Sequence, residues 1–492
     1  MARLTREQVA LGIIFLLVLG IRLAYTLPLD SYSYDAYFAL RQADAIRHTG
    51  TPYFQDPLSY SGRTYLFPPL FEYVIALFAL VFSVEVAAKL VTSLSFASIT
   101  ILAYLLSRQV TKNKTIPLVA ALFTGFIPVM YFTTDSFSSQ SLSLLLVFLL
   151  SYFFLRLDEE KSASFAVITS ILLLLTSQDV FIFLFGLAFY FIILFLEKQK
   201  PTKREVELTV FLFFLAIWFN IILYKKALFL HGAGVLWSNM PSAILSTYFQ
   251  DVSFVGILYS VGVIPLLLGI YAIYNLVFDA KNRGAHLFMG FAISSFLALW
   301  LKLVPLSTGL LFLSVNTIIL SAYTMRVTQL GIAKTKMESL STILGFIVVL
   351  LFLLTTMSPF FTYTRIEPQH PEDLKAMAWL KENTNEDAVV LAGVEEGFML
   401  NYLAERRNVA DSNFLFVKNA NQVYEDTSRM YSLRLKSEAI RLINAYDVDY
   451  VLLSKRVQES RNMTSLFYEE GACIRKVYDK GAVIYELRGC KI

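Results

Sequence analysis

Residues Asp30–Glu72 read DSYSYDAYFALRQADAIRHTGTPYFQDPLSYSGRTYLFPPLFE and directly follow the first long apolar run of the chain. The stretch holds four aspartates, three arginines and many tyrosines, and no other segment before residue 360 is polar over such a length. A connection this long between hydrophobic segments is typically either functional or disordered. Its aromatic content is too high for a disordered segment. We therefore predict an ordered, functional loop over residues 29–85.

The chain around this loop has the composition of a membrane protein. Of its 492 residues, 56% are hydrophobic and 16% are charged, whereas about a quarter are charged in soluble domains. The apolar segments approach the ~20 residues that cross a bilayer as a helix, and we expect about 11–13 spans in a mostly α-helical bundle. The first segment lacks a small-residue cleavage site, which favours a retained helix over a signal peptide. Eleven spans have the approximate limits 8–28, 86–107, 116–132, 139–156, 163–178, 180–197, 206–224, 252–278, 286–303, 305–325 and 339–360.

Basic residues predict the orientation of these spans. Arg3 and Arg6 precede the first span, and lysines or arginines occur in the connections 108–114, 156–161, 198–204, 281–283 and 326–336. A cytoplasmic N-terminus places all of these connections inside, as the positive-inside rule requires. The loop 29–85 and all residues after 360 then lie outside, in a multi-pass protein of the cell membrane. The net charge of +4 is too small to indicate a nucleic-acid partner.

Residues 361–492 have the composition of a soluble domain, in contrast to the transmembrane domain over residues 1–360. We predict a small extracytoplasmic α/β domain with helices over 371–383 and 436–445, strands over 388–392 and 449–453, and a hairpin over 473–487. Both cysteines, Cys473 and Cys490, fall in this domain. On the oxidising side of a membrane they can form a disulfide or remain two buried thiols.

The candidate chemistry rests on aspartates at the predicted outer end of the bundle. The sequence lacks the common zinc, nucleotide and hydrolase motifs, and its four histidines are scattered. Asp35 is flanked by aromatic residues at the membrane boundary, where an unused carboxylate is unfavourable. Asp135 lies in a hydroxyl-rich turn between two spans, while Asp44 and Asp56 read as solvated loop residues. Carboxylates in such positions can hold Mg²⁺ or Mn²⁺ or act as general bases.

A family resemblance follows from these residues. The letters DAYF at 35–38, with Arg41 three residues later, resemble the D-x-Y-F-x-x-R element of the catalytic subunit of oligosaccharyltransferase of the archaeal type. That subunit is a GT-C membrane glycosyltransferase. The following Gly-Thr-Pro turn, Asp56-Pro57 and Gly62-Arg63 are also similar. In the C-terminal domain, 371–387 resembles the family's opening helix, and 393–413 follows the region around its W-W-D-Y-G signature.

This resemblance implies transfer of a sugar or glycan from a polyprenyl-phosphate-linked donor to an acceptor on the outer face. Mg²⁺ or Mn²⁺ would be the divalent cofactor. The implied catalytic and metal-binding residues are Asp35 and Asp135. The implied donor-phosphate ligands are Arg41, Arg63 and Lys302.

The chain also departs from the family pattern. The signature positions read Gly-Val-Glu-Glu-Gly at 393–397, so we expect an acceptor other than the ordinary glycosylation sequon. The second-loop acidic pair falls at Ser138 and Gln140, with Asp135 three residues before Ser138. The acceptor-site candidates are Gln250, Asp251, Glu395 and Glu396.

We interpret the chain as a GT-C-type membrane glycosyltransferase that uses a lipid-linked sugar. Two alternatives stay open. The lost acidic and tryptophan positions favour a non-catalytic paralogue that binds lipid-linked glycan or a partner protein. A transporter would be favoured by charged residues buried in mid-span, and the predicted spans contain few of these.

Overall fold

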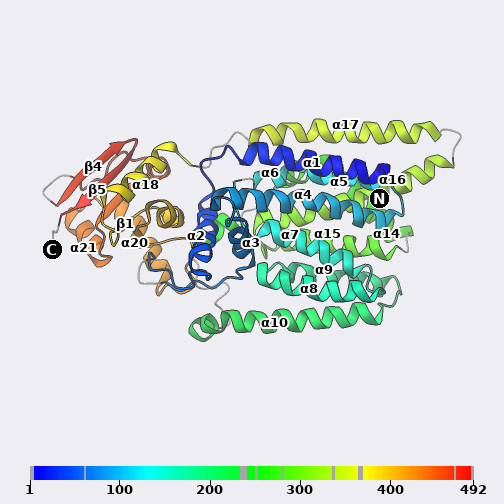
Figure 1. Ribbon diagram of the computed structural model, residues 1–492, viewed down its shortest axis with the longest axis horizontal. Coiled ribbons are helices and arrows are strands. Elements are labelled where there is room, and N and C mark those ends of the chain that lie inside the picture. Colours follow the sequence, from blue (N-terminus) through cyan, green and yellow to red (C-terminus); the bar gives the residue numbers. More distant parts are fainter. Residues whose placement is uncertain are drawn as a thin grey trace.

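The computed structural model describes residues 5–59, 63–133, 135–232, 241–249, 253–279, 282–334, 338–363, 369–469 and 473–488. A long helical bundle is followed by a smaller part that contains a β-sheet. Helices α2 (Tyr34–Thr49) and α3 (Leu70–Phe78) lie between the two parts (Figure 1). The N-terminus lies at the end of the bundle away from the sheet (Figure 1). The fold is therefore mostly helical with a small C-terminal mixed sheet, as the sequence predicts.

Each of the eleven predicted apolar ranges contains a helix or a broken helix. The helices of the bundle are α1 (Arg6–Thr26), α4 (Val84–Thr111), α5 (Ile116–Gly125), α6 (Pro128–Phe132), α7 (Gln140–Phe154), α8 (Glu160–Thr176), α9 (Val180–Leu196), α10 (Lys203–His231), α13 (Phe254–Val261), α14 (Val263–Asp279), α15 (Arg283–Trp300), α16 (Leu306–Ala333) and α17 (Glu338–Tyr363). A short helix, α12 (Ser242–Tyr248), lies in the connection between α10 and α13.

Two of the ranges are broken at residues that interrupt helices. Pro128 begins α6 after a break from α5. Gly262 separates α13 from α14 with a φ of 87°, a left-handed conformation that glycine adopts without steric penalty. Helices α13 and α14 are bent by 104° relative to each other.

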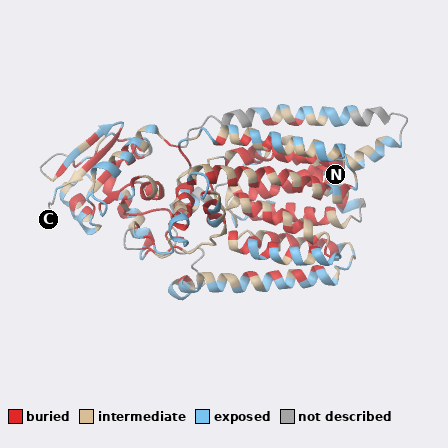
Figure 2. Cartoon of the chain, viewed as in Figure 1, coloured by how far each residue is buried: buried red, intermediate tan, exposed pale blue. Residues whose placement is uncertain are grey.

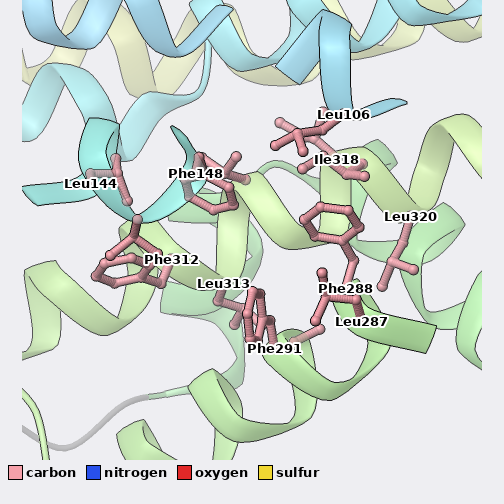
Figure 3. Packing of buried hydrophobic residues seen from close by; sticks show 14 of the residues in the cluster. Leu106, Leu144, Phe148, Leu287, Phe288, Phe291, Phe312, Leu313, Ile318 and Leu320 are labelled. Carbon is pink, nitrogen blue, oxygen red and sulfur yellow. The ribbon is translucent and has the colours of Figure 1, made fainter. Parts of the chain in front are cut away.

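The core of the bundle is filled by aromatic and aliphatic side chains from α4, α7, α15 and α16 (Figure 3). Phe148 of α7 stacks on Phe312 of α16 with ring centroids 6.2 Å apart. Helices α9 and α15 approach closely at glycines, because a Cβ atom at Gly290 would lie 2.8 Å from the backbone nitrogen of Tyr190. Small residues at such contacts allow helices to pack tightly in a membrane.

The outside of the bundle is apolar. Figure 2 shows α10 and the described middle part of α17 as mostly exposed or intermediate, and Trp218 and Phe346 are 63% and 68% exposed. Within the part of the chain that the structure describes, four helices are long and apolar enough to cross a membrane, or five if α13 and α14 form one span, and shorter apolar helices accompany them. A lipid environment would cover these side chains, so the chain is a multi-pass membrane protein.

The first connection between spans is ordered as predicted. Helix α2 buries Ala36, Leu40 and Ala43 on one face and ends at Gly50, whose φ is 80°. The ammonium group of Lys89, on α4, donates hydrogen bonds to the carbonyls of Leu27 and Leu29 at 3.0 and 2.7 Å. These bonds satisfy carbonyls at and beyond the C-terminal end of α1, where the loop begins.

The C-terminal part is a five-stranded sheet of order β2-β1-β3-β5-β4. Strand β1 pairs in parallel with β2 and β3, whereas β5 is antiparallel to β3 and β4. Its elements are α18 (Pro371–Asn383), β1 (Val389–Leu391), β2 (Arg407–Asn408), α20 (Ala420–Ser432), α21 (Lys436–Ala445), β3 (Tyr450–Leu453), α22 (Lys455–Arg461), β4 (Ile474–Lys480) and β5 (Ala482–Leu487). Between β1 and β2, a 3-10 turn (Val394–Glu396) leads into the short helix α19 (Gly397–Met399) and a π-helical turn (Leu400–Ala404).

Candidate active site

Asp35 lies in the first turn of α2, where a helix N-terminus favours negative charge. Its side chain is exposed, and the hydroxyl of Ser412 donates a 3.3 Å hydrogen bond to its Oδ1 atom. The preceding residue, Tyr34, lies with its ring 4.5 Å from the guanidinium carbon of Arg456. Residues of the C-terminal part therefore contact both sides of the start of α2.

The turn that carries Asp135 lies against the start of α2. The backbone nitrogen of Ser33 donates a 3.1 Å hydrogen bond to the carbonyl of Asp135. The rings of Tyr32 and Phe137 have centroids 4.8 Å apart. Burial raises the pKa of the Asp135 carboxyl. The two segments with the predicted catalytic aspartates are thus adjacent in space although far apart in sequence.

Other polar groups gather at the same end of the bundle. The Gln140 amide, at the start of α7, donates hydrogen bonds to the hydroxyls of Ser307 and Thr308 at 3.3 and 2.8 Å. One turn further along α7, the hydroxyl of Ser143 donates to the carboxyl of Asp179. Burial raises the pKa of Asp179, which lies in the turn between α8 and α9. The ends of α7, α9 and α16 that lie near the Asp135 turn are therefore joined by polar contacts.

Lys302 lies in the connection between α15 and α16, four residues before the start of α16. It is exposed and adopts a left-handed conformation with φ 54°, which closes the end of α15. Because Ser307, in the first turn of α16, contacts Gln140, this lysine lies at the end of the bundle that carries the Asp135 turn.

The two arginines predicted to bind phosphate make contacts of another kind. Arg41 forms a bidentate pair with Asp56 at 2.6 and 3.0 Å and donates to the carbonyl of Asn401 at 2.8 Å. Arg63 pairs with Asp411 at 3.1 Å and donates to the carbonyl of Val409 at 2.9 Å. These contacts fasten the first outer loop to the C-terminal part. They also correct the interpretation of Asp56 as a solvated residue, because it is buried.

Asp411 is a site residue that sequence reasoning did not single out. It is fully buried, and its carboxylate accepts hydrogen bonds from the hydroxyl of Tyr65 at 2.8 Å and from the backbone nitrogen of Asn413 at 3.0 Å. The next residue is Ser412, which contacts Asp35. The local sequence Val-Ala-Asp-Ser-Asn gave no signal of this role, because every loop partner is at least 346 residues away.

The acceptor-site candidates divide into three cases. Glu395 is half-buried and pairs with Arg456 at 2.9 Å. Glu396 is buried and accepts hydrogen bonds from the Ser454 hydroxyl at 2.6 Å and the Gly393 nitrogen at 2.9 Å. Burial raises the pKa of Glu396 to about 7. Gln250 and Asp251 lie outside the described residues, as does Cys490, so the choice between a disulfide with Cys473 and two buried thiols stays a prediction.

A cavity of about 400 Å³ opens beside Glu395 and Arg456. It is bounded by the turn at residues 393–396, by α20 and by α22. Because the ring of Tyr34 packs on Arg456, this cavity lies next to the segment that carries Asp35.

The donor atoms near Asp35 set limits on a metal ion. Among the residues that the structure describes, no group of three or more His, Cys, Asp or Glu side chains could hold one. Mg²⁺ commonly keeps several waters and binds through one or two carboxylates plus substrate phosphates. No metal site made of protein side chains alone is therefore evident among the described residues.

A bundle of apolar helices, a long first outer loop with an acidic helix N-terminus, and a C-terminal mixed sheet packed over that loop together define the fold of GT-C membrane glycosyltransferases. No family model matches the sequence, and no curated protein matches it. The fold is nevertheless clear from solved structures.

The archaeal oligosaccharyltransferase AglB from Archaeoglobus fulgidus, in its apo form, has a TM-score of 0.71 at 13% identity over 92% of this chain and 70% of AglB. AglB in complex with an inhibitory peptide and a dolichol-phosphate has a TM-score of 0.70 at 13% identity, covering 91% and 69%. ArnT from Cupriavidus metallidurans bound to undecaprenyl phosphate has a TM-score of 0.58 at 11% identity, covering 97% of both chains. A further AglB structure is a complex with Zn and sulfate.

Proposed function

We propose that the protein transfers a sugar or glycan from a polyprenyl-phosphate-linked donor to an acceptor on the outer face of the membrane. The observation that carries the proposal is the hydrogen bond between Ser33 and Asp135, which brings the Asp35 and Asp135 segments together at the sheet-bearing end of the bundle. The similar AglB and ArnT structures, which hold dolichol-phosphate and undecaprenyl phosphate, support a lipid phosphate donor. The basic connections at the opposite end of the bundle support this end as the outer one.

The chemistry is a displacement at the anomeric carbon with inversion. A lone pair of the acceptor atom forms a bond to that carbon while the bond from carbon to the phosphate oxygen breaks. The bonding electron pair leaves with the lipid phosphate, and the acceptor proton passes to a carboxylate. Asp35 suits this role of general base because its side chain is exposed and its carboxylate lies in the first turn of α2.

Lys302 suits stabilisation of the departing phosphate, because a cation at the outer end of the bundle favours the charge that develops there. We leave Arg41 and Arg63 out of this role, since their guanidinium groups are occupied by Asp56 and Asp411. Asp35 and Asp135 would hold Mg²⁺ or Mn²⁺ together with the donor phosphate. The ion, when bound, would neutralise phosphate charge as a Lewis acid.

The test is turnover of dolichyl- or undecaprenyl-phosphate-linked hexose by the full chain in proteoliposomes with added membrane extract as acceptor. We expect Asp35→Asn to lower transfer by about 100-fold or more, the size of a general-base effect. Asp44→Asn is the matched control, because Asp44 is on the same helix and pairs with Arg47 at its surface. Equal turnover by the two variants would refute the role of Asp35.

Lys302 has its own matched control. Lys198 also closes a helix in a left-handed conformation, with φ 54°, in the connection after α9 at the opposite end of the bundle. We expect Lys302→Gln to weaken binding of undecaprenyl phosphate, measured by native mass spectrometry, and Lys198→Gln to leave it unchanged. Equal binding by both variants would remove Lys302 from the donor site.

A further inference from the structure

The cavity beside Glu395 and Arg456 has an unusual lining for a site that receives a peptide side chain. Nine of its twelve lining residues carry hydrogen-bonding or charged side chains, and the other three are Gly393, Val394 and Val457. Its volume of about 400 Å³ falls in the range of roughly 300–1,000 Å³ that is typical of small-molecule sites. A ligand here must therefore satisfy many polar groups within a small space.

The hydrogen bonds already present show what the lining still offers. The hydroxyls of Thr427 and Ser460 donate to backbone carbonyls of their own helices, so their lone pairs remain as acceptors. Ser428 Oγ accepts a 2.8 Å hydrogen bond from Arg461. Arg456 uses one nitrogen on Glu395, and a guanidinium carries five N–H donors. The lining thus presents both acceptors and donors.

This mixture selects among ligand classes. A phosphate or carboxylate only accepts hydrogen bonds, and it would face the Glu395 carboxylate and the hydroxyl lone pairs. A threonine side chain has one hydroxyl and a methyl group, and it would pair with few of the donors and acceptors of the lining. A sugar ring carries several hydroxyls, each of which donates and accepts. Only this last class matches the lining as a whole.

The position of the cavity gives the ligand a role. Arg456 lines it and packs on Tyr34, and the next residue, Asp35, is the proposed base. Resting on the proposed function, we infer that this cavity binds the acceptor, and that the acceptor is the terminal sugar of a carbohydrate. One of its hydroxyls reaches Asp35. That oxygen forms the new bond to the anomeric carbon of the donor, its proton passes to Asp35, and the lipid phosphate leaves with the bonding electron pair.

Binding can be measured without turnover. The full chain in nanodiscs is mixed with methyl α-mannoside, methyl β-glucoside and N-acetylglucosamine, and saturation-transfer NMR reports which sugar contacts the protein. Acetyl-threonine amide and sodium phosphate serve as competitors. We expect transfer to at least one sugar and no displacement by either competitor. No transfer to any sugar, or displacement by threonine amide or phosphate, would overturn the inference.

Glu395→Gln is the informative variant, because the pair with Arg456 is half-exposed and contributes little to folding. We expect it to weaken sugar binding about tenfold or more, as loss of one charged hydrogen-bond acceptor does. Glu405→Gln is the matched control, since it breaks a similar surface pair with Lys381 outside this cavity. Equal sugar affinity in the two variants would contradict the assignment.

Asp35→Asn separates this inference from the proposed function. The variant should lose transfer and keep sugar binding. Wild-type protein that binds sugar but never turns over a lipid-linked donor would refute the transferase proposal and leave the sugar site intact. Wild-type turnover with an unchanged acceptor KM in Glu395→Gln would refute the sugar site alone.

Discussion

The buried pair between Asp411 and Arg63 predicts how strongly the C-terminal part is fastened to the first outer loop. The Arg63 side chain is 7% exposed and that of Asp411 is 0% exposed, with 3.1 Å between them. Asp411→Asn keeps the shape and one acceptor oxygen, but it leaves the arginine charge buried without its carboxylate. Removing one member of such a pair typically destabilises by about 3–5 kcal/mol. We therefore expect local opening of this interface to become easier by roughly 3 kcal/mol.

Hydrogen exchange measures this opening directly. The backbone amide of Asn408 donates to the carbonyl of Leu58 across the interface at 3.0 Å, so its exchange requires the two parts to separate. A loss of roughly 3 kcal/mol corresponds to about 100-fold faster exchange when opening is local. Peptides that contain Asn408 should show this change by mass spectrometry in Asp411→Asn.

Asp387→Asn is the matched control. Asp387 also pairs with an arginine of the C-terminal part, Arg407, but its side chain is 85% exposed. Exposed pairs contribute about 0–1 kcal/mol, so exchange at Asn408 should change by less than about fivefold. Equal exchange rates in the two variants would refute the view that the buried pair holds the interface. The double variant R63L/D411L should recover part of the loss, because it removes both charges.

Three further predictions concern stability. Burial raises the pKa of Glu396 to about 7 from 4.5, so the folded state keeps this proton to a higher pH than the unfolded chain does, and the free energy of unfolding falls as pH rises from about 4.5 to 7. Glu396→Gln should remove this pH-dependent contribution, which is on the order of 3 kcal/mol, when denaturation curves are compared at pH 5 and pH 8. The same pH dependence in the wild type and the variant would contradict the prediction. Gly397→Ala should destabilise the protein by about 1–3 kcal/mol, because the new Cβ atom would lie 2.4 Å from the carbonyl oxygen of Ala410. The control is Gly345→Ala, where the new Cβ atom would have no other atom within 4 Å. This control should leave the melting temperature unchanged in the same thermal melt. Lys89→Met should lower the melting temperature, because two carbonyls at the end of α1 lose their donor, and an unchanged value would show that water replaces it.

The sequence predicts the local structure well where a strong pattern lies within one element. The predicted helices 371–383 and 436–445 have the same limits as α18 and α21. In the first case Pro371 begins the helix, and in both an apolar stripe defines the buried face. The eleven apolar ranges likewise each hold a helix, because hydrophobic length is a local property. Helix α2 ends at Thr49 because Gly50 adopts a left-handed conformation there.

The contacts that assemble the candidate site could not be predicted in this way. The motif resemblance drew attention to Arg41 and Arg63 as phosphate ligands, yet both guanidinium groups are buried against carboxylates and backbone carbonyls. Whether an arginine at a loop boundary meets a substrate or an aspartate depends on which remote segment packs over it. A single sequence has no local signal for that choice. The same reason explains why Asp411, an unremarkable residue in its own segment, was missed.

These contacts also bear on how the site depends on the C-terminal part. Residues of the first loop and of segment 398–404 share one apolar core. In this core the ring centroids of Phe38 and Phe398 are 5.1 Å apart, and those of Tyr37 and Tyr402 are 5.9 Å apart. Helix α2, which carries Asp35, is therefore packed between the bundle and the sheet-bearing part. A perturbation that loosens the C-terminal part should move Asp35 even when no residue at the bundle's outer end is changed. If Asp411→Asn accelerates hydrogen exchange at Asn408, it should also lower turnover of the lipid-linked donor. The ratio of the fold-change in turnover to the fold-change in exchange rate would measure how strongly the position of Asp35 depends on this packing.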